Sequence, residues 1–427
     1  MTRHLTTTGL VLAAILTATP ALALTLEEAV SRALARHPDT LAAEVQLEGT
    51  RLTVQDAEAQ RWNASTDVNA LQRRSQTATT GGANASRDQS TLQGNVALTV
   101  PLFTGFRITH TIEAARADLR AAEASRRQTR LEVSLQTSRA FWAVARTEGA
   151  LAIQREALAG AEQLLELTRS GVRTGRLSAS ELDQAEAAVL SSRTDMLARE
   201  ADLQEARVRL ATLVDLEPGA LRLDGTESPS SAGGPETPTT ERPNLQAIEA
   251  RRDAAEARAG IAEAGRWPQI SVGSTLQLGN NPFDPTLGAR GVSDWAGVWD
   301  ARLTLSYDAF DWTGRIGRDI SRARQEARRQ ELALERERRN LSEQARVAQN
   351  RLDAAKARTD LAARAVLLAR KVLDWTTTRQ AQGYATQLEV VQARNQLVTS
   401  RLQELQARIE ARLARTELDH LTVKEAP

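Results

Sequence analysis

The sequence predicts a mainly α-helical chain with membrane β-strands, built from two copies of one unit. Three observations support this fold class. Short segments recur about 205 residues apart, long proline-free stretches space their apolar residues as coiled coils do, and the segments before those stretches alternate apolar and polar residues. Each copy is therefore expected to hold a strand pair followed by a long helical hairpin.

The first residues are typical of a secretory signal. Arg3 and His4 precede an apolar run, and residues 21–23 (Ala-Leu-Ala) have the small-x-small form of a cleavage site. The apolar run is too short to span a membrane as a helix. We therefore expect residues 1–23 to be a signal peptide.

Composition argues against several classes of function. The 427 residues include 55 basic and 54 acidic ones, so no net field favours a nucleic-acid partner. Cysteine is absent, and the four histidines show no metal-ligand spacing. No phosphate-binding loop or nucleophile motif follows a predicted strand. The sequence thus predicts no catalytic, cofactor or metal site, and an enzyme is not expected.

The repeat is visible at two places. Residues 57–62 (AEAQRW) return as residues 262–267 (AEAGRW), an offset of 205. Residues 175–185 resemble residues 383–393 at an offset of 208, and the two segments share Gly, Glu, Gln and Ala at matching positions. Loop insertions between fixed elements explain the drift in offset, so two copies of one structural unit are predicted.

Each copy contains a long segment in which a helix need never break. No proline occurs between Pro101 and Pro218, or between Pro285 and Pro427. A helix over residues 314–381 is about 100 Å long, far more than a compact domain needs. The apolar positions follow a coiled-coil spacing: Ile108, Ile112, Ala115, Leu119 and Ala122 in the first copy, and Leu341, Ala345, Ala348, Leu352, Ala355, Thr359, Ala362, Val366, Ala369 and Leu373 in the second.

A reversal is predicted near the far end of each long helix. Gly175 and Gly383 permit a tight turn. A hydroxyl residue then precedes a glutamate by three positions, which is the spacing of a capping box at the start of a return helix: Ser178 with Glu181, and Thr386 with Glu389.

In the segments ahead of each long helix, apolar residues occupy every second position. The alternating segments have about the ten residues that a tilted membrane strand needs, and they pair across polar loops expected at Thr77–Gln89 and Gly279–Ser293. Four strands cannot close a barrel, and a bilayer does not tolerate an open strand edge. If these strands span a membrane, the chain must therefore be an oligomer; two copies would give eight strands and three would give twelve.

These features give a predicted domain organisation. After the signal peptide of residues 1–23, the chain is divided as follows: a first repeat over 24–215, with a strand pair at about 62–104 and a hairpin at about 106–215; an irregular Pro-rich linker over 216–243; and a second repeat over 244–427, with a strand pair at about 267–312 and a hairpin at about 314–420.

The residues resemble the TolC family of outer-membrane efflux proteins. Residues 24–30 (LTLEEAV) are similar to that family's first mature helix, and residues 100–105 (VPLFTG) are similar to its strand-to-helix junction. The resemblance implies a homotrimer with a twelve-stranded β-barrel in the outer-membrane lipid of a Gram-negative bacterium and a helical barrel in the periplasm. It implies a passive exit duct of a tripartite efflux or type I secretion system, fed through a periplasmic adaptor by an inner-membrane pump of RND, ABC or MFS type.

The same resemblance assigns roles at the hairpin tips. It implies a pore gate at Glu181, Glu389 and Gln392, where the glutamine leaves the gate less acidic than an aspartate would. Both glutamates also suit ordinary helix capping. Contacts with the adaptor are implied at the tip residues Gly175, Arg176, Ser178, Gly383, Tyr384 and Thr386.

Three tryptophans fall at predicted strand–helix junctions: Trp62, Trp267 and Trp312. Amphipathic aromatics in such positions mark a membrane interface, although each could instead pack at the junction. A competing functional class is the periplasmic adaptor, which would have one hairpin rather than two. The sequence alone fits drugs, metal ions or a secreted protein as cargo.

Overall fold

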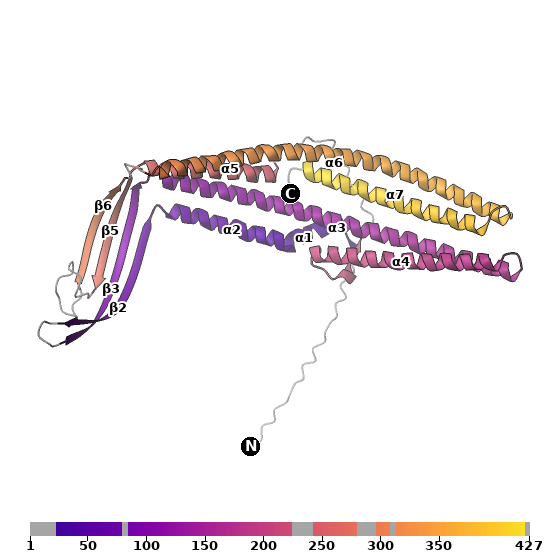
Figure 1. Cartoon of the computed structure of the whole chain (residues 1–427), viewed down its shortest axis with the longest axis horizontal. Coiled ribbons are helices and arrows are strands. Elements are labelled where there is room, and N and C mark those ends of the chain that lie inside the picture. Colours follow the sequence, from indigo (N-terminus) through magenta and orange to yellow (C-terminus); the bar gives the residue numbers. More distant parts are fainter. Residues whose placement is uncertain (1–22, 79–83, 224–241, 280–295, 308–312, 423–427) are drawn as a thin grey trace, which may run out of the picture. The chain divides into compact units, whose positions relative to one another are not determined.

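The computed structural model describes residues 23–78, 84–223, 242–279, 296–307 and 313–422, and Figure 1 labels their elements. The internal duplication is confirmed by matched helices. α3 (Arg107–Arg173) and α6 (Arg315–Ala381) have 67 residues each. α4 (Ala179–Val214) and α7 (Gln387–Thr422) have 36 residues each.

Shorter helices precede each strand pair. α1 (Leu26–Arg36) begins at a capping box in which Thr25 accepts from the backbone N–H of Glu28. α2 (Pro38–Ala59) and α5 (Pro243–Glu263) both start on proline, which lacks the N–H that a helix start leaves unpaired. α2 and α5 thus occupy equivalent positions in the two copies.

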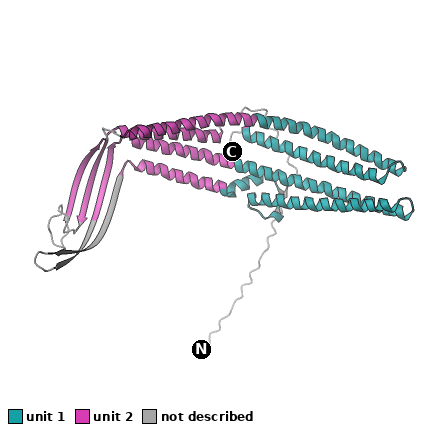
Figure 2. Cartoon of the chain, in the orientation of Figure 1, with its two compact units in different colours: residues 1–38, 132–236, 346–421 teal, residues 39–131, 237–345, 422–427 magenta. Residues whose placement is uncertain are grey.

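The described chain divides into two units that cut across the duplication (Figure 2). Unit 1 comprises residues 1–38, 132–236 and 346–421, and unit 2 comprises the remainder. The long helices α3 and α6 contribute to both units, because each is continuous across a unit boundary.

Unit 1 has an apolar core where α1, α3, α4 and α7 meet. Val144, Leu210 and Val214 are its largest fully buried side chains. Burying one such side chain stabilises the fold by about 1.5–3 kcal/mol. The cluster also includes Leu24, Ala29, Phe141, Trp142, Leu151, Leu203, Ala206, Ala211, Leu221 and Ile409.

Unit 2 repeats one packing arrangement. Ala57 of α2 packs with Ile112 and Ala115 of α3, and Leu245 of α5 packs with Leu334 and Leu341 of α6. The predicted heptad stripe is confirmed here and in unit 1, since its members Leu341, Ala348, Leu352, Ala355 and Ala369 are buried. Small residues in the seam allow the helices to approach closely.

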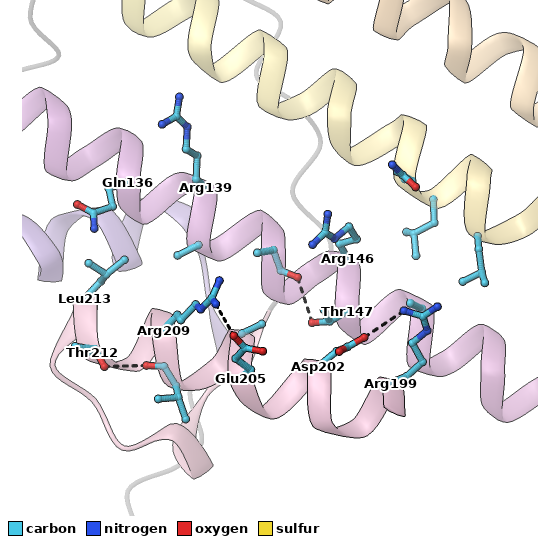
Figure 3. A pocket seen from close by; sticks show the side chains of 18 residues that line it. Gln136, Arg139, Arg146, Thr147, Arg199, Asp202, Glu205, Arg209, Thr212 and Leu213 are labelled. Atoms are coloured by element: carbon cyan, nitrogen blue, oxygen red, sulfur yellow. Dashed lines mark hydrogen bonds and ion pairs between the residues drawn. The ribbon is translucent and has the colours of Figure 1, made fainter. Parts of the chain in front are cut away.

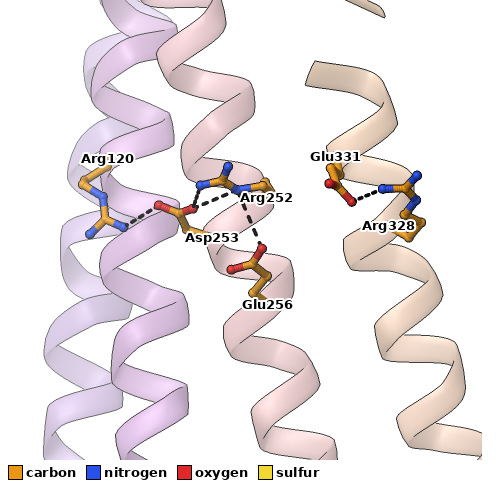
Figure 4. A network of polar contacts seen from close by, with 6 residues as sticks. All are labelled: Arg120, Arg252, Asp253, Glu256, Arg328 and Glu331. Carbon is orange, nitrogen blue, oxygen red and sulfur yellow. Dashed lines mark hydrogen bonds and ion pairs between the residues drawn. The ribbon is translucent and has the colours of Figure 1, made fainter. Parts of the chain in front are cut away.

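Ion pairs on the helix surfaces connect neighbouring helices of unit 2 (Figure 4). Asp253 of α5 accepts from Arg120 of α3 at 3.3 Å and from Arg252 at 2.7 Å. Arg328 and Glu331 pair within α6. Exposed pairs of this kind contribute about 0–1 kcal/mol each, so they add little to the stability of the fold.

The four-stranded sheet of unit 2 is antiparallel with the order β2-β3-β5-β6. Its strands are β2 (Asn63–Ala78), β3 (Asn84–Phe103), β5 (Gln269–Gly279) and β6 (Ala296–Ser306). The β3–β5 register shifts between Pro101 and Phe103. A bulge suits this position because proline has no N–H for the ladder.

The first strand pair is longer than the sequence predicted. β2 and β3 have 16 and 20 residues, and their pairing extends to Ala78 opposite Asn84. Most of the loop expected at Thr77–Gln89 is therefore strand. The sequence hid this because residues 72–90 are almost uniformly polar, and backbone pairing does not require apolar alternation.

The segment predicted as an irregular linker holds some regular structure. η1 (Pro218–Ala220) is a short 3₁₀ helix, and β4 (Arg222–Leu223) pairs in parallel with β1 (Ala23–Leu24). Residues 224–241 of the linker and residues 1–22 of the predicted signal peptide lie outside the described residues.

Candidate functional site

The first hairpin tip closes α3 with a Schellman motif. The N–H of Arg176 donates to the carbonyl of Gly171 at 2.9 Å, and the N–H of Gly175 donates to that of Val172 at 3.0 Å. Gly175 has φ +71°, in the left-handed region that glycine adopts most easily. The predicted reversal at Gly175 is therefore confirmed.

The second tip repeats this geometry 208 residues later. The N–H of Tyr384 donates to the carbonyl of Arg379 at 2.8 Å, and the N–H of Gly383 donates to that of Gln380 at 2.9 Å. Gly383 has φ +80°. Arg379 also donates to the carbonyl of Tyr384 at 3.0 Å and lies over the ring of Trp375, 5.0 Å from its centroid.

The predicted gate glutamates both lie in the first turn of a capped helix, and Glu181 completes a capping box. Glu181 accepts from the N–H of Ser178 at 2.8 Å, and Ser178 accepts in return from the N–H of Glu181 at 3.3 Å. Thr386 accepts from the N–H of Glu389 at 3.3 Å. Gln392 lies one turn further along α7 and is exposed. Capping is thus established, and a pore role for these residues stays a prediction.

The residues predicted to contact an adaptor are gathered at the two tips. Arg176 and Ser178 of the first tip are exposed, as are the two tip glycines. Tyr384 and Thr386 of the second tip are also exposed. Each tip therefore presents polar and aromatic side chains to its surroundings, and their role in adaptor binding stays a prediction.

A buried relay of hydrogen bonds links the two hairpins close to the tips. Gln387 of α7 is 3% exposed and donates to the hydroxyl of Thr168 of α3, itself 1% exposed, at 2.8 Å. Gln380 of α6 donates to the carbonyl group of the Gln387 side chain. Thr168 donates onward to the carbonyl of Leu164 at 2.8 Å. Buried amides need such partners, so this relay fixes how α3, α6 and α7 meet.

Two arginines continue the contact between α3 and α7. Arg394 donates to the backbone carbonyl of Gly160, and a Cβ at position 160 would lie 2.7 Å from the Arg394 Nη1. Burial lowers the pKa of the Arg394 guanidinium from its ordinary value. Arg401 pairs with Glu156 at 2.5 Å. Residues 387, 394 and 401 are spaced by seven, so they form one stripe of α7 that faces α3.

The sequence interpretation missed this polar stripe. Its signal was present, because a glutamine and two arginines recur at seven-residue spacing on α7. Such a spacing is also typical of a solvated helix face, and the partner helix is not visible in the sequence. The contacts of Gln387 with Thr168, of Arg394 with Gly160 and of Arg401 with Glu156 show that the stripe packs on α3 rather than facing solvent.

The sheet has one apolar face and one polar face. Paired rows such as Val96, Leu276 and Trp299 share the apolar face. Leu303 on the same face is 69% exposed. The opposite face carries mostly polar residues, including Asn95, Gln277, Thr275, Asp300, Arg302 and Thr304. An exposed apolar sheet face calls for an apolar environment outside the chain.

The predicted interface tryptophans lie at the end of the sheet. Trp62 directly precedes β2 and is 67% exposed, and Trp267 precedes β5 and is 55% exposed. Trp312 lies outside the described residues. The interface role of these tryptophans stays a prediction.

Two other kinds of feature are absent from the part of the chain that the structure describes. No cluster of three or more His, Cys, Asp or Glu residues there is arranged to hold a metal ion. Among the same residues, no helix combines the length and the apolar character needed to cross a membrane.

Comparison with known proteins gives matches of sequence and of fold. The model of the family described as outer membrane efflux protein matches residues 29–215 and 238–422. The nickel-cobalt-cadmium resistance protein NccC of Alcaligenes xylosoxydans is 26% identical over 196 residues, 45% of this chain and 44% of NccC. The pyoverdine export outer membrane protein OpmQ of Pseudomonas aeruginosa is 27% identical over 174 residues, 39% of this chain and 37% of OpmQ. The aligned parts span less than half the length of either relative.

Solved structures share the fold across nearly the whole chain. The outer membrane protein VceC of Vibrio cholerae superposes with a TM-score of 0.77 at 20% identity and covers 93% of this chain and 95% of VceC. The outer membrane channel CmeC of Campylobacter jejuni gives 0.79 at 15% identity, over 93% of this chain and 85% of CmeC. With the family model matched twice along its length, the chain belongs to the outer membrane efflux protein family, which places it in the outer membrane of a Gram-negative bacterium and extending into the periplasm.

Proposed function

We propose that three copies of this chain form a passive exit duct through the outer membrane, as part of a tripartite efflux or type I secretion system. The observation that carries the proposal is the four-stranded sheet, which has one exposed apolar face and two strand edges without a partner in the described residues. The duct performs no chemistry, and the inner-membrane pump supplies the energy for transport.

The sheet edges argue for assembly. Within the described residues β2 pairs only with β3, and β6 pairs only with β5. Unpaired backbone groups cost several kcal/mol each in a bilayer, so lipid-exposed edges do not persist there. Pairing β6 of one copy with β2 of the next removes every edge. Three copies then give the twelve strands that the family resemblance implies.

Apolar stripes on two helices of unit 1 support the same assembly. α6 exposes Leu361, Leu368 and Trp375 at intervals of seven residues. α4 exposes Leu190 and Leu197 at the same interval. A seven-residue apolar repeat is a packing surface for another helix. We assign these stripes to contacts between α6 of one copy and α4 of its neighbour.

The hairpin tips are the proposed contact with the adaptor. Both tips end in the same turn, and both expose polar or aromatic side chains there, including Arg176 and Tyr384. The alternative that this chain is itself an adaptor is not favoured, because two hairpins, α3–α4 and α6–α7, accompany a four-stranded sheet. The adaptor and an RND, ABC or MFS pump are therefore partners of this chain.

We propose that the acidic residues at the tips make the entrance of the duct prefer cations. Replacing Glu181 and Glu389 together by glutamine removes six charges from a trimer and keeps a side-chain acceptor at both positions, since the capping box of Glu181 accepts Glu or Gln. We expect a lower preference for cations in single-channel recordings at unchanged thermal stability. Replacement of Gln392 by Glu is the matched opposite change and should raise that preference. Unchanged selectivity in both variants would leave the glutamates with capping alone.

Cargo is not fixed by similarity. The two relatives are named for resistance to nickel, cobalt and cadmium and for export of pyoverdine, which are chemically different solutes. Likeness to them therefore supports the duct and leaves its selectivity to be argued from the walls of the duct itself.

Membrane fractionation and bilayer recording test the duct directly. After cell fractionation, the chain should be found in the outer-membrane fraction. Its migration on a gel should change on heating, as the migration of stable β-barrels does. Added to a planar bilayer, it should produce stepwise conductance. A soluble monomer in the periplasmic fraction that produces no conductance would overturn the proposal.

A further inference from the structure

A broad groove of about 950 Å³ lies in unit 1 between α3, α4 and α7 (Figure 3). Its floor is made of small and aliphatic side chains such as Ala143 and Ala150. We call this surface the arginine groove. Its charged residues are four arginines and two carboxylates: Arg139, Arg146, Arg199, Arg209, Asp202 and Glu205.

The carboxylates of the groove are already paired. Asp202 accepts from Arg199 at 3.2 Å, and Glu205 accepts from Arg209. Arg139 pairs with Glu417 of α7 at 2.7 Å. Among the described residues Arg146 makes no ion pair, and it is exposed (Figure 3). Arg146 is therefore the uncompensated charge of the groove.

The groove opens on one side of the α3–α4 pair, and α1 lies on the other. Residues two apart on a helix point in directions about 200° apart. Arg146 and Arg209 line the groove, whereas Glu148 and Arg207, two residues away on each helix, form an ion pair of 2.8 Å. Ala211 belongs to the core cluster that includes Ala29 of α1. The α1 side is therefore closed by packing, and the groove side is open.

We propose that the arginine groove faces the lumen of the duct and makes this section of the lumen, which lies away from the acidic residues of the tips, favour anionic solutes such as those bearing carboxylate or phosphate groups. The inference rests on the proposed function. In the proposed tube the side of the helices that α1 covers faces outward and the open groove side faces the axis, and each copy contributes one Arg146. The result is a ring of uncompensated positive charge in the path of the cargo.

The charge of such a ring acts over a useful distance. The Debye length is about 8 Å at physiological ionic strength, and a low-dielectric wall concentrates the field inside a channel. At about 1 M salt the Debye length falls to about 3 Å, so the effect of the ring must shrink. Dependence on salt concentration therefore accompanies the proposed selectivity.

Reversal potentials in a KCl gradient test the inference on the full-length chain in planar bilayers. We expect Arg146→Gln to lower the chloride-to-potassium permeability ratio by about twofold at 0.1 M salt, and by less at 1 M. Arg146→Lys keeps the charge and should keep the ratio. Arg32→Gln is the matched control, because Arg32 is exposed on α1 and lies away from the groove.

The outcomes separate this inference from the proposed function. If the wild-type chain conducts and Arg146→Gln changes the ratio no more than Arg32→Gln does, the groove does not set selectivity and the duct stands. If Arg146→Lys changes the ratio as much as Arg146→Gln, the side chain acts through its shape and the charge argument is wrong. If the wild-type chain does not conduct, the duct itself is overturned, and the inference with it.

Discussion

Replacing Leu303 by arginine is expected to prevent stable insertion into the outer membrane. Leu303 is exposed on the apolar face of the sheet, three residues before β6 ends at Ser306. An arginine facing lipid costs about 2–4 kcal/mol at the bilayer midplane and less toward the interfaces, and a trimer would carry this cost three times. The variant should therefore be depleted from the outer-membrane fraction, and its heat-modifiable form should be lost.

The neighbouring residue supplies the control. Thr304 alternates with Leu303 along β6 and lies on the polar face, which already carries Arg302. Thr304→Arg introduces the same side chain and the same charge on the polar face, so it should insert normally. If both variants insert like the wild-type chain, the apolar face does not meet lipid. If both fail, the strand tolerates no added bulk and the two faces are not distinguished.

The helices and the second strand pair could be predicted from the sequence because each has one dominant period. The heptad stripe of α6 contains buried residues such as Leu341 and Leu352. The alternation in β5 and β6 separates an apolar from a polar face, as Leu303 and Thr304 illustrate. The glycine reversals were also visible, because a left-handed residue after a long helix is most often glycine.

The first strand pair and the link between the hairpins could not be predicted for a different reason. Residues 72–90 have no apolar alternation, so the length of β2 and β3 depends on backbone pairing alone. The contact of Gln387 with Thr168 depends on which helices are neighbours. A periodic pattern identifies a face of a helix, but it does not name the helix that covers it.

In the candidate site, too, some features follow from the local sequence and others depend on neighbouring elements. The turn and the capping geometry follow from local residue types, and the sequence placed both correctly at Glu181 and Glu389. Lumenal exposure depends on assembly, which no local pattern encodes. The groove around Arg146 went unnoticed because its residues come from three helices that are distant in the sequence.

Replacing Gly105 by alanine is expected to destabilise the strand–helix junction far more than the equivalent change in the second copy. Gly105 connects β3 to α3 with φ +61°, and Gly314 precedes α6 with φ +62°. A Cβ at position 105 would lie 2.6 Å from the Cβ of Trp267 and 2.9 Å from the carbonyl oxygen of Ala264. A Cβ at position 314 meets nothing nearer than 3.5 Å.

Both substitutions carry the cost of a left-handed alanine, about 1–2 kcal/mol, and only Gly105→Ala adds an overpacking cost of about 1–3 kcal/mol. The overpacking has no easy relief, because the atoms that approach are a Cβ and a backbone oxygen rather than the end of a flexible side chain. Thermal unfolding of the detergent-solubilised protein, followed by helical circular dichroism, should show a clearly lower midpoint for Gly105→Ala than for Gly314→Ala. Equal midpoints would mean that Trp267 moves aside at little cost and that the junction is not held by this contact.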